Sequence, residues 1–528
     1  MKTRYFLLTC VCYGLATVSL SAQVWAPTGT ETRRPSALQF DAGTSQFRGD
    51  YYVYLSPNFT YNHGSQFGYS FSLPLNFLSV DRAPKLSGQS TGELRQIDYN
   101  SRQDYLRTLN YISYGTYNQQ VPGKFTYSLY AGKVIDGYVG HGTILNKYQS
   151  SSRFDAYNPS VLADANSDYG GVQYFSNSVA SFNVNVVRVY VKPLAIGRKV
   201  MSFFQDQSGS VYFLNIRGKV IDDAGRKSVE EEISSEDTVA KQKKEKEIRP
   251  IQKDSRVEIA ENDPWYNRLT LGYTSAWDRG APVTLSYSSN GAPLLEKTSD
   301  QPTISTSKTV RVEGFDAEYR LLNLSFLEFT PYFDFNRIKT LDNSTGTHYG
   351  ASLRIGNKDL NVILKPELRQ MTGNYIPMYF DSFYEIERFQ SFPAVAPMRT
   401  KFENLETQGN GTIKGYLHTI YLNFYHLGFE FAVEDYGGKE KKRVFAAAYI
   451  PIGSSFQVSF FFTKKGYGGQ SNLFEVDENS QGAAEISKSF GPLMFRVQNY
   501  RRFVLDVAEK TFVSTDEVRF LVSGGMSF

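Results

Sequence analysis

The feature that most constrains this chain is an alternation of apolar and polar side chains through long stretches of sequence. In residues 51–61, every second side chain is apolar or aromatic, while the other face carries Tyr, Ser, Asn and Thr. The same period-two pattern recurs in residues 67–77, 327–336, 349–356, 362–369 and 427–434. Such alternation predicts β-strands. About 10 residues let a tilted strand cross a bilayer, whereas strands of soluble proteins average about 5–6 residues.

Charged side chains on the second face of these strands leave two architectures open. In a soluble sandwich, that face would meet water and the apolar face would form a core. In a transmembrane barrel, the apolar face would meet lipid and the charged face would line the lumen. Alternation alone does not separate the two.

The C-terminal strand favours the barrel. Counted back from the end of the chain, Phe528, Met526, Val522 and Phe520 share one face. A terminal amphipathic strand suits a sheet that closes on itself and leaves no free edge. These four residues also resemble the signal that outer-membrane barrels present to their assembly machinery. We therefore predict an all-β fold, a single large antiparallel transmembrane β-barrel of about 14–18 strands with long loops.

The N-terminus indicates export. Lys2 and Arg4 precede an apolar run, so residues 1–22 are expected to form a signal peptide that is cleaved after Ala22. Both cysteines, Cys10 and Cys12, fall inside it, which excludes disulfides, thiolate metal sites and a cysteine nucleophile from the exported protein. The expected location is the bacterial outer membrane.

Composition removes other classes. Mean hydropathy is −0.37, and no later run is apolar enough for a membrane helix. Aromatic residues make up 15% of the chain, which argues against disorder. A net charge of +4 gives no reason to expect nucleic acid as a partner.

The domain organisation is expected to be one barrel over residues 23–528, interrupted by a charged low-complexity loop at 222–263. Within 226–256, nine Lys/Arg and eight Asp/Glu stand among 31 residues, a composition that cannot form a membrane strand. We expect both termini to be periplasmic and this loop to be extracellular. Residues 80–103 and 149–169 are predicted to be further long connections.

Six runs of sequence stand out in this chain: residues 104–115, 127–132, 140–148, 168–172, 373–381 and 384–388. Together they resemble an uncharacterised family of large outer-membrane proteins from spirochaetes and some other diderm bacteria. The resemblance covers roughly residues 100–195 and 310–390, and 226–256 looks like an insertion. It implies location and architecture, with no catalytic residue to carry over. Its most distinctive part is Gly140-His141-Gly142-Thr143-Ile144.

The candidate functional residues are charges on the second face of the strands, which are expected to line the lumen. They are Asp316, Glu318, Arg320, Arg354, Lys365, Glu367, Arg369, Glu430 and Glu434. Their mixed signs predict a polar channel with little ion preference, unless they form ion-pair ladders that fill a closed barrel.

Metal and catalytic chemistry find little support. None of the five histidines pairs with another at HxH or HxxxH spacing. His141, between Gly140 and Gly142, is a possible functional or structural motif, and we favour a structural hydrogen bond for it. Nucleophile-elbow, P-loop and EF-hand motifs are absent. We predict no metal, no cofactor and no enzymatic activity.

The function predicted first is a porin-like channel or transporter for small polar solutes. The alternative is a surface-exposed interaction or adhesin-type barrel that acts through its long loops. The expected partners are outer-membrane lipid, the barrel assembly machinery and small polar solutes. The oligomeric state stays open.

Overall fold

The computed structural model describes residues 36–207 and 265–527, except 48, 64–65, 83–89, 96–97, 101, 118, 135–136, 151–157, 290, 292, 295–301, 358–359, 391–398, 407–410, 426, 438–441, 454, 469–471, 474 and 507–510. The expected signal peptide at 1–22, the charged loop at 222–263 and Phe528 lie outside the described residues.

Antiparallel strands make up nearly all of the regular structure. The strands are β1 (Ala37–Phe47), β2 (Asp50–His63), β3 (Phe67–Ser72), β4 (Leu75–Val80), β5 (Leu109–Tyr114), β6 (Thr126–Gly132), β7 (Ser160–Asn166), β8 (Gly170–Ser176), β9 (Val184–Val191), β10 (Leu269–Leu285), β11 (Ile304–Tyr319), β12 (Leu322–Leu324), β13 (Leu327–Ile338), β14 (Thr345–Gly356), β15 (Leu360–Thr372), β16 (Thr412–Phe424), β17 (Leu427–Asp435), β18 (Arg443–Ile452), β19 (Phe456–Lys465), β20 (Ser480–Phe490), β21 (Leu493–Asp506) and β22 (Thr511–Ser527). The helical elements are α3 (Arg102–Leu106), α4 (Pro193–Gln207), the 3-10 turn η4 (Trp265–Asn267), α5 (Tyr384–Glu387) and α6 (Lys401–Glu406).

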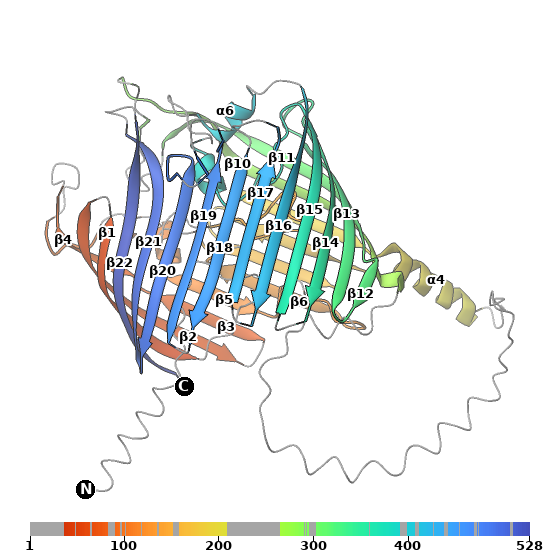
Figure 1. Cartoon of the computed structure of the whole chain (residues 1–528), viewed down its shortest axis with the longest axis horizontal. Helices are drawn as coiled ribbons and strands as arrows, with labels where there is room; N and C mark the ends of the chain where they lie inside the picture. Colours follow the sequence, from red (N-terminus) through yellow and green to blue (C-terminus); the bar gives the residue numbers. More distant parts are fainter. Residues whose placement is uncertain are drawn as a thin grey trace, which may run out of the picture.

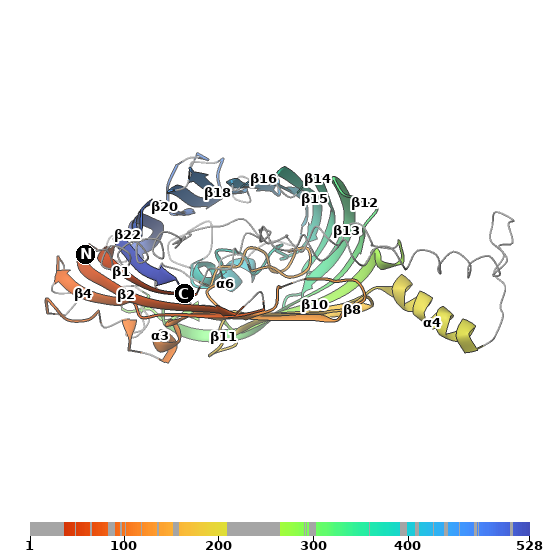
Figure 2. The ribbon, with the colours of Figure 1, turned by 90° about the horizontal axis from the view of Figure 1, so that it is seen from below.

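The sheet closes on itself, as the C-terminal strand predicted. β1 pairs with β2 on one side and with β22 on the other, so that Ala37 lies opposite Ser527 and Phe47 opposite Glu517. Figures 1 and 2 show the resulting ring, whose cross-section is oval. The predicted fold class, a single antiparallel transmembrane β-barrel, is confirmed.

The barrel is larger than the 14–18 strands expected. β3 and β4 pair with β2 in one continuous register across Pro74, and β11 and β12 both pair with β13. Each couple therefore forms a single crossing of the barrel wall, and we call each such crossing a stave. In the described part of the chain, the 22 strands thus form 20 staves. The estimate was too low because it assumed about 10 residues per strand, whereas β5 to β9 have only 6 to 8. β7 also lies inside 149–169, which the sequence had suggested was a connection.

Alternation along the strands separates an outer from an inner face. In β17, Phe429 and Phe431 point outward and are about 40% exposed (38% and 44%), whereas Glu430 and Glu434 point inward and are 3% exposed. The same division of apolar outside and charged inside holds in β15, in β11 from Phe315 onward and in β13 up to Phe335. Elsewhere in β11 and β13 it reverses: Val310, Val312 and Ile338 lie on the inner face, whereas Arg311, Glu313 and Arg337 lie on the outer face. None of the helices in the described part of the chain is long and apolar enough to cross a membrane.

The strand directions define two rims. We call the end of the barrel at Ala37 and Ser527 the terminus rim, and the other end the opposite rim. β1 leads away from the terminus rim and each stave reverses the direction, so β9, the eighth stave, returns to it at Val191. Figure 1 shows α4 at the same end as the C-terminus.

This topology corrects the side predicted for the charged loop. The segment that contains 222–263 joins β9 to β10, and both strands meet it at the terminus rim. It therefore starts and ends on the same side as the termini, and the expected placement opposite them is wrong. The prediction failed because loop length was used to assign the side, without a count of the strands.

Candidate functional site: a constriction inside the barrel

Two connections at the opposite rim fold into the barrel instead of extending away from it. The first inner segment, residues 133–159, links β6 to β7, and the second inner segment, residues 373–411, links β15 to β16. Seen from below in Figure 2, α6 of the second inner segment lies within the ring of strands. The described parts of these two segments contain two of the sequence motifs, Gly140–Ile144 in the first segment and Gly373–Asp381 in the second.

The two inner segments pair through their backbones. Leu145 and Phe380 form a parallel bridge. The N–H groups of Met378 and Phe380 donate to the carbonyls of Thr143 (2.8 Å) and Ile144 (3.1 Å), and the Asn146 N–H donates to the Phe380 carbonyl (3.1 Å). Because unpaired backbone groups are costly when buried, this ladder holds the segments together inside the lumen.

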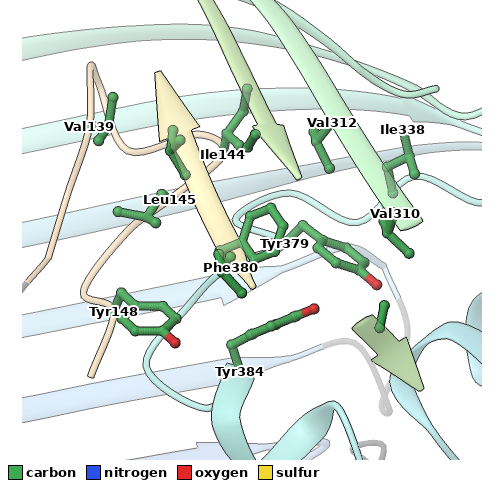
Figure 3. Packing of buried hydrophobic residues seen from close by; sticks show 14 of the residues in the cluster. Val139, Ile144, Leu145, Tyr148, Val310, Val312, Ile338, Tyr379, Phe380 and Tyr384 are labelled. Carbon is green, nitrogen blue, oxygen red and sulfur yellow. The ribbon is translucent and has the colours of Figure 1, made fainter. Parts of the chain in front are cut away.

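A hydrophobic cluster fixes the paired segments against one side of the wall. Phe380 and Tyr384 contact each other with ring centroids 4.8 Å apart, and Tyr148 contacts Phe175 of β8 at 4.9 Å. Figure 3 shows the aromatic rings of the inner segments beside apolar residues of the wall, and the labelled members of the cluster are Val139, Ile144, Leu145, Tyr148, Val310, Val312, Ile338, Tyr379, Phe380 and Tyr384. The lumen is thus partly filled by a packed apolar core.

The Gly-His-Gly motif anchors the first inner segment to the wall. Gly140 and Gly142 have φ of +60° and +85°, a backbone region that favours glycine. The His141 ring is 4.3 Å from the ring of Tyr332. Its Nδ1 lies 2.8 Å from Asp334 and its Nε2 lies 3.0 Å from Glu318. Burial alone would lower the pKa of His141, but Asp334 and Glu318 raise that pKa to about 10, so the ring is a buried imidazolium.

A second anchor holds the end of the Gly373–Asp381 motif. Asp381 accepts from Arg443 of β18 at 2.9 Å and from Lys465 of β19 at 3.0 Å. Glu387 of α5 forms ion pairs with Lys401 of α6 and with Lys465. Burial raises the pKa of Asp381, but Lys465, Lys401 and Arg443 together hold it well below its ordinary value. This cluster ties the second inner segment to the wall on the side of β18 and β19.

Further ion pairs join the inner segments to other strands. Lys147 of the first inner segment pairs with Glu430 of β17. In the second inner segment, Arg388 lies 3.3 Å from Asp278 of β10, and the Tyr384 hydroxyl donates to the same carboxylate at 2.7 Å. Since these partners come from different parts of the wall, the constriction is attached to several staves.

The residues predicted to line the lumen fall into two groups. Asp316, Glu318, Glu367, Arg369, Glu430 and Glu434 lie on the inner face and already have charged partners, for example Asp316 with Arg188 at 2.6 Å and Arg369 with both Glu367 and Glu434. The others lie nearer the terminus rim. Arg320 and Arg354 both pair with Glu328, at 3.5 and 3.1 Å, and Lys365 lies 5.5 Å from the ring of Tyr421.

Sequence reasoning missed the partners of the inner segments. Their signal was present in part, because Asp334 stands on the charged face of a predicted strand and Asp381 ends the second motif. What the sequence did not indicate was that both motifs enter the lumen. The missed residues are Arg188, Asp278, Asp334, Asp381, Glu385, Glu387, Arg388, Lys401, Arg443 and Lys465.

One group near the Gly-His-Gly motif has metal-ligand chemistry. His141, Asp316 and Asp334 present ligand atoms within 4.8 Å of one another. However, Arg188 donates two hydrogen bonds to Asp316, at 3.0 and 2.6 Å, and His141 is itself a cation. The carboxylates therefore already face two positive charges, and we assign the group to anchoring the segment.

Comparisons with known proteins give structural matches only. Neither a family model nor a curated protein sequence matches the chain. Among solved structures, it is similar to Pseudomonas aeruginosa OpdL (7% identity, 94% of this chain and 99% of that chain, TM-score 0.30). It is also similar to OccK5 (OpdH) of the same organism (9%, 94% and 98%, 0.30) and to a mutant of its ferric enterobactin receptor PfeA (7%, 96% and 82%, 0.32). At these values the matches carry no argument about function, and they do not bear on a spirochaete origin.

Proposed function

We propose that the protein is an outer-membrane channel for small polar solutes, with its selectivity set by the constriction. The carrying observation is a ring of 20 staves whose lumen is narrowed by two of its own connections. Barrels of about 16–18 strands already leave an aqueous channel. A wall of this size therefore needs additional structure to restrict what passes, and the inner segments supply it.

The polarity of the two faces supports the same proposal. Outward residues such as Phe315 and Leu368 are large, apolar and 62% exposed, which suits contact with lipid. The inner face carries acidic and basic side chains in comparable number, including Glu318, Arg320 and Arg354. Mixed charges favour polar solutes of either sign rather than one ion class.

The interaction-barrel alternative has no observation in its favour. It depended on the charged segment and on the long N-terminal connections 80–103 and 149–169. However, β7 lies within 149–169, and residues 133–159 fold inward in their described parts. The charged segment leaves from the terminus rim. The proposal assigns no reaction to the barrel.

Single-channel recording tests the proposal. Purified full-length protein is added to planar lipid bilayers, and heat-modifiable gel mobility first shows that the preparation is folded. We expect discrete conductance steps with weak cation–anion selectivity in a salt gradient. The same preparation after heat denaturation is the control. Folded protein that carries no current at any voltage would refute the channel.

A further inference from the structure

The helix α4 leaves the wall without a linker. Val191 ends β9, Lys192 follows, and the Lys192 carbonyl accepts from the N–H groups of Ala195 and Ile196, both at 3.1 Å. Pro193 suits the first helical turn, where no N–H is needed. The Lys192 ammonium donates to Gln120 at 2.8 Å, which fixes the start of the helix at the terminus rim.

Only a narrow side of α4 contacts the rest of the protein. Ala195 is 3% exposed, and the Arg198 guanidinium lies 4.1 Å above the ring of Tyr266 in η4. Figures 1 and 2 both show the helix outside the ring of strands, directed away from it. Most of its surface is therefore not covered by the barrel.

The other side of α4 is apolar and exposed. Ile196 and Val200 are four residues apart and share a face, and Met201 lies beside them. They are 38%, 47% and 58% exposed. At 100° per residue, Arg198, Lys199 and Ser202 fall on the opposite face. The apolar face of this amphipathic helix is thus not covered by the barrel, and Arg198 and Lys199 on the other face are exposed as well.

The apolar face continues the lipid-facing surface of the wall. Val189 and Val191 of β9 and Leu271 of β10 are exposed outward residues immediately before and beside the helix, and Trp265 of η4 is 62% exposed. Tryptophan is enriched where membrane barrels meet the headgroup layer. The molecules that cover these outward residues at the terminus rim are therefore positioned to cover the apolar face of α4 as well.

We propose that α4 is an interfacial membrane helix. Its apolar face is buried at the boundary between acyl chains and headgroups in the leaflet at the terminus rim. Arg198 and Lys199 are then directed toward the lipid phosphates, as is usual for helices that lie in the interface plane. The partner is phospholipid. The proposal depends on the barrel being in a membrane and not on whether it conducts.

Fluorescence quenching at single cysteines tests the proposal. The two cysteines of the chain, Cys10 and Cys12, are first changed to Ser. Single variants Val200→Cys and Met201→Cys probe the apolar face, and Lys199→Cys and Ser202→Cys are matched controls one residue away. Each full-length variant carries an environment-sensitive fluorophore and is refolded into vesicles of phosphatidylethanolamine and phosphatidylglycerol. Quenching by doxyl-labelled lipid is compared with quenching by aqueous iodide.

We expect lipid-borne doxyl to quench labels at 200 and 201 at least as strongly as a reference label at Val191→Cys, and iodide to quench labels at 199 and 202. Iodide quenching of all four labels alike would place the helix in water and overturn the proposal. Protection of 200 and 201 from both quenchers would mean that a second copy or another protein covers the face, which overturns it as well. Heat-modifiable mobility of each variant shows that the barrel has folded.

Discussion

The wall of the barrel and the two inner segments are specified in different ways. In the wall, each residue is assigned to lipid or lumen by its position in a two-residue repeat, as Phe431 and Glu434 show in β17. In the inner segments no such repeat exists, and the structure depends on partners far apart in the chain, such as Leu145 with Phe380. The wall is thus a local property of the sequence, and the constriction is a tertiary one.

The wall and the inner segments also differ in how a change of charge affects their stability. A charge introduced at an outward position in the middle of the wall would meet hydrocarbon, so its cost depends on its depth in the membrane. A charge in the lumen is compensated by specific opposite charges, and removal of one partner leaves the other buried. A charge introduced on the outer face should therefore destabilise the whole barrel, whereas loss of one anchor should release an inner segment and leave the barrel folded.

The largest effect is expected at the Asp381 cluster. Asp381→Asn removes the carboxylate that Arg443 and Lys465 share. Loss of one partner of a buried ion pair costs about 3–5 kcal/mol, which should release the second inner segment while the barrel stays folded. We expect larger single-channel conductance with unchanged heat-modifiable mobility.

Asp516→Asn is the matched control for Asp381→Asn. Asp516 also pairs with an arginine, Arg501 at 2.6 Å, but this pair is exposed and far from the inner segments. Exposed pairs contribute only about 0–1 kcal/mol, so neither conductance nor stability should change. If Asp381→Asn conducts as wild type does, the cluster does not hold the constriction.

The next effect concerns the wall. Leu364 is the middle outward residue between Leu360 and Leu368 on β15. Leu364→Arg places a charge near the centre of the lipid-facing surface and should destabilise the barrel by about 2–4 kcal/mol. Lys365→Gln changes the adjacent inward side chain and should be nearly neutral for folding. Urea titration of protein refolded in lipid vesicles measures both, and equal losses would contradict the assigned facing.

The wall could be predicted from the sequence to a much greater extent than the inner segments. The long alternating strands 51–61, 362–369 and 427–434 predicted the β-strands and the faces of their side chains, because alternation acts at every position. The C-terminal strand predicted that the sheet closes into a barrel. The short strands β5 to β9 were undercounted, since six to eight residues carry little periodic signal. The anchors were not predicted, because nothing local to Asp381 indicates that Arg443 and Lys465 will reach it.

The smallest effect is expected at His141, where wall and inner segment meet through a single titratable ring. Its pKa of about 10 lies above the ordinary value of about 6.5. A raised pKa means that the anchoring contribution is complete below about pH 6.5 and is lost as pH rises through about 10. His141→Gln stays neutral at every pH and loses hydrogen bonds to charged groups, which contribute about 1.5–3 kcal/mol.

We therefore expect wild type and His141→Gln to differ most at neutral pH and to converge above pH 10. The groups that face the ring are Asp334, Glu318 and Tyr332, with Arg188 and Asp316 beside them. Other groups in the lumen are the same in both proteins, so the difference in single-channel conductance between wild type and His141→Gln, measured at each pH, isolates His141. NMR of protein with ¹⁵N-labelled histidine locates the titration directly. A curve for wild type that parallels His141→Gln from pH 6 to 11 would show that the imidazolium does not hold the first inner segment, and the hydrophobic cluster alone would then have to do so.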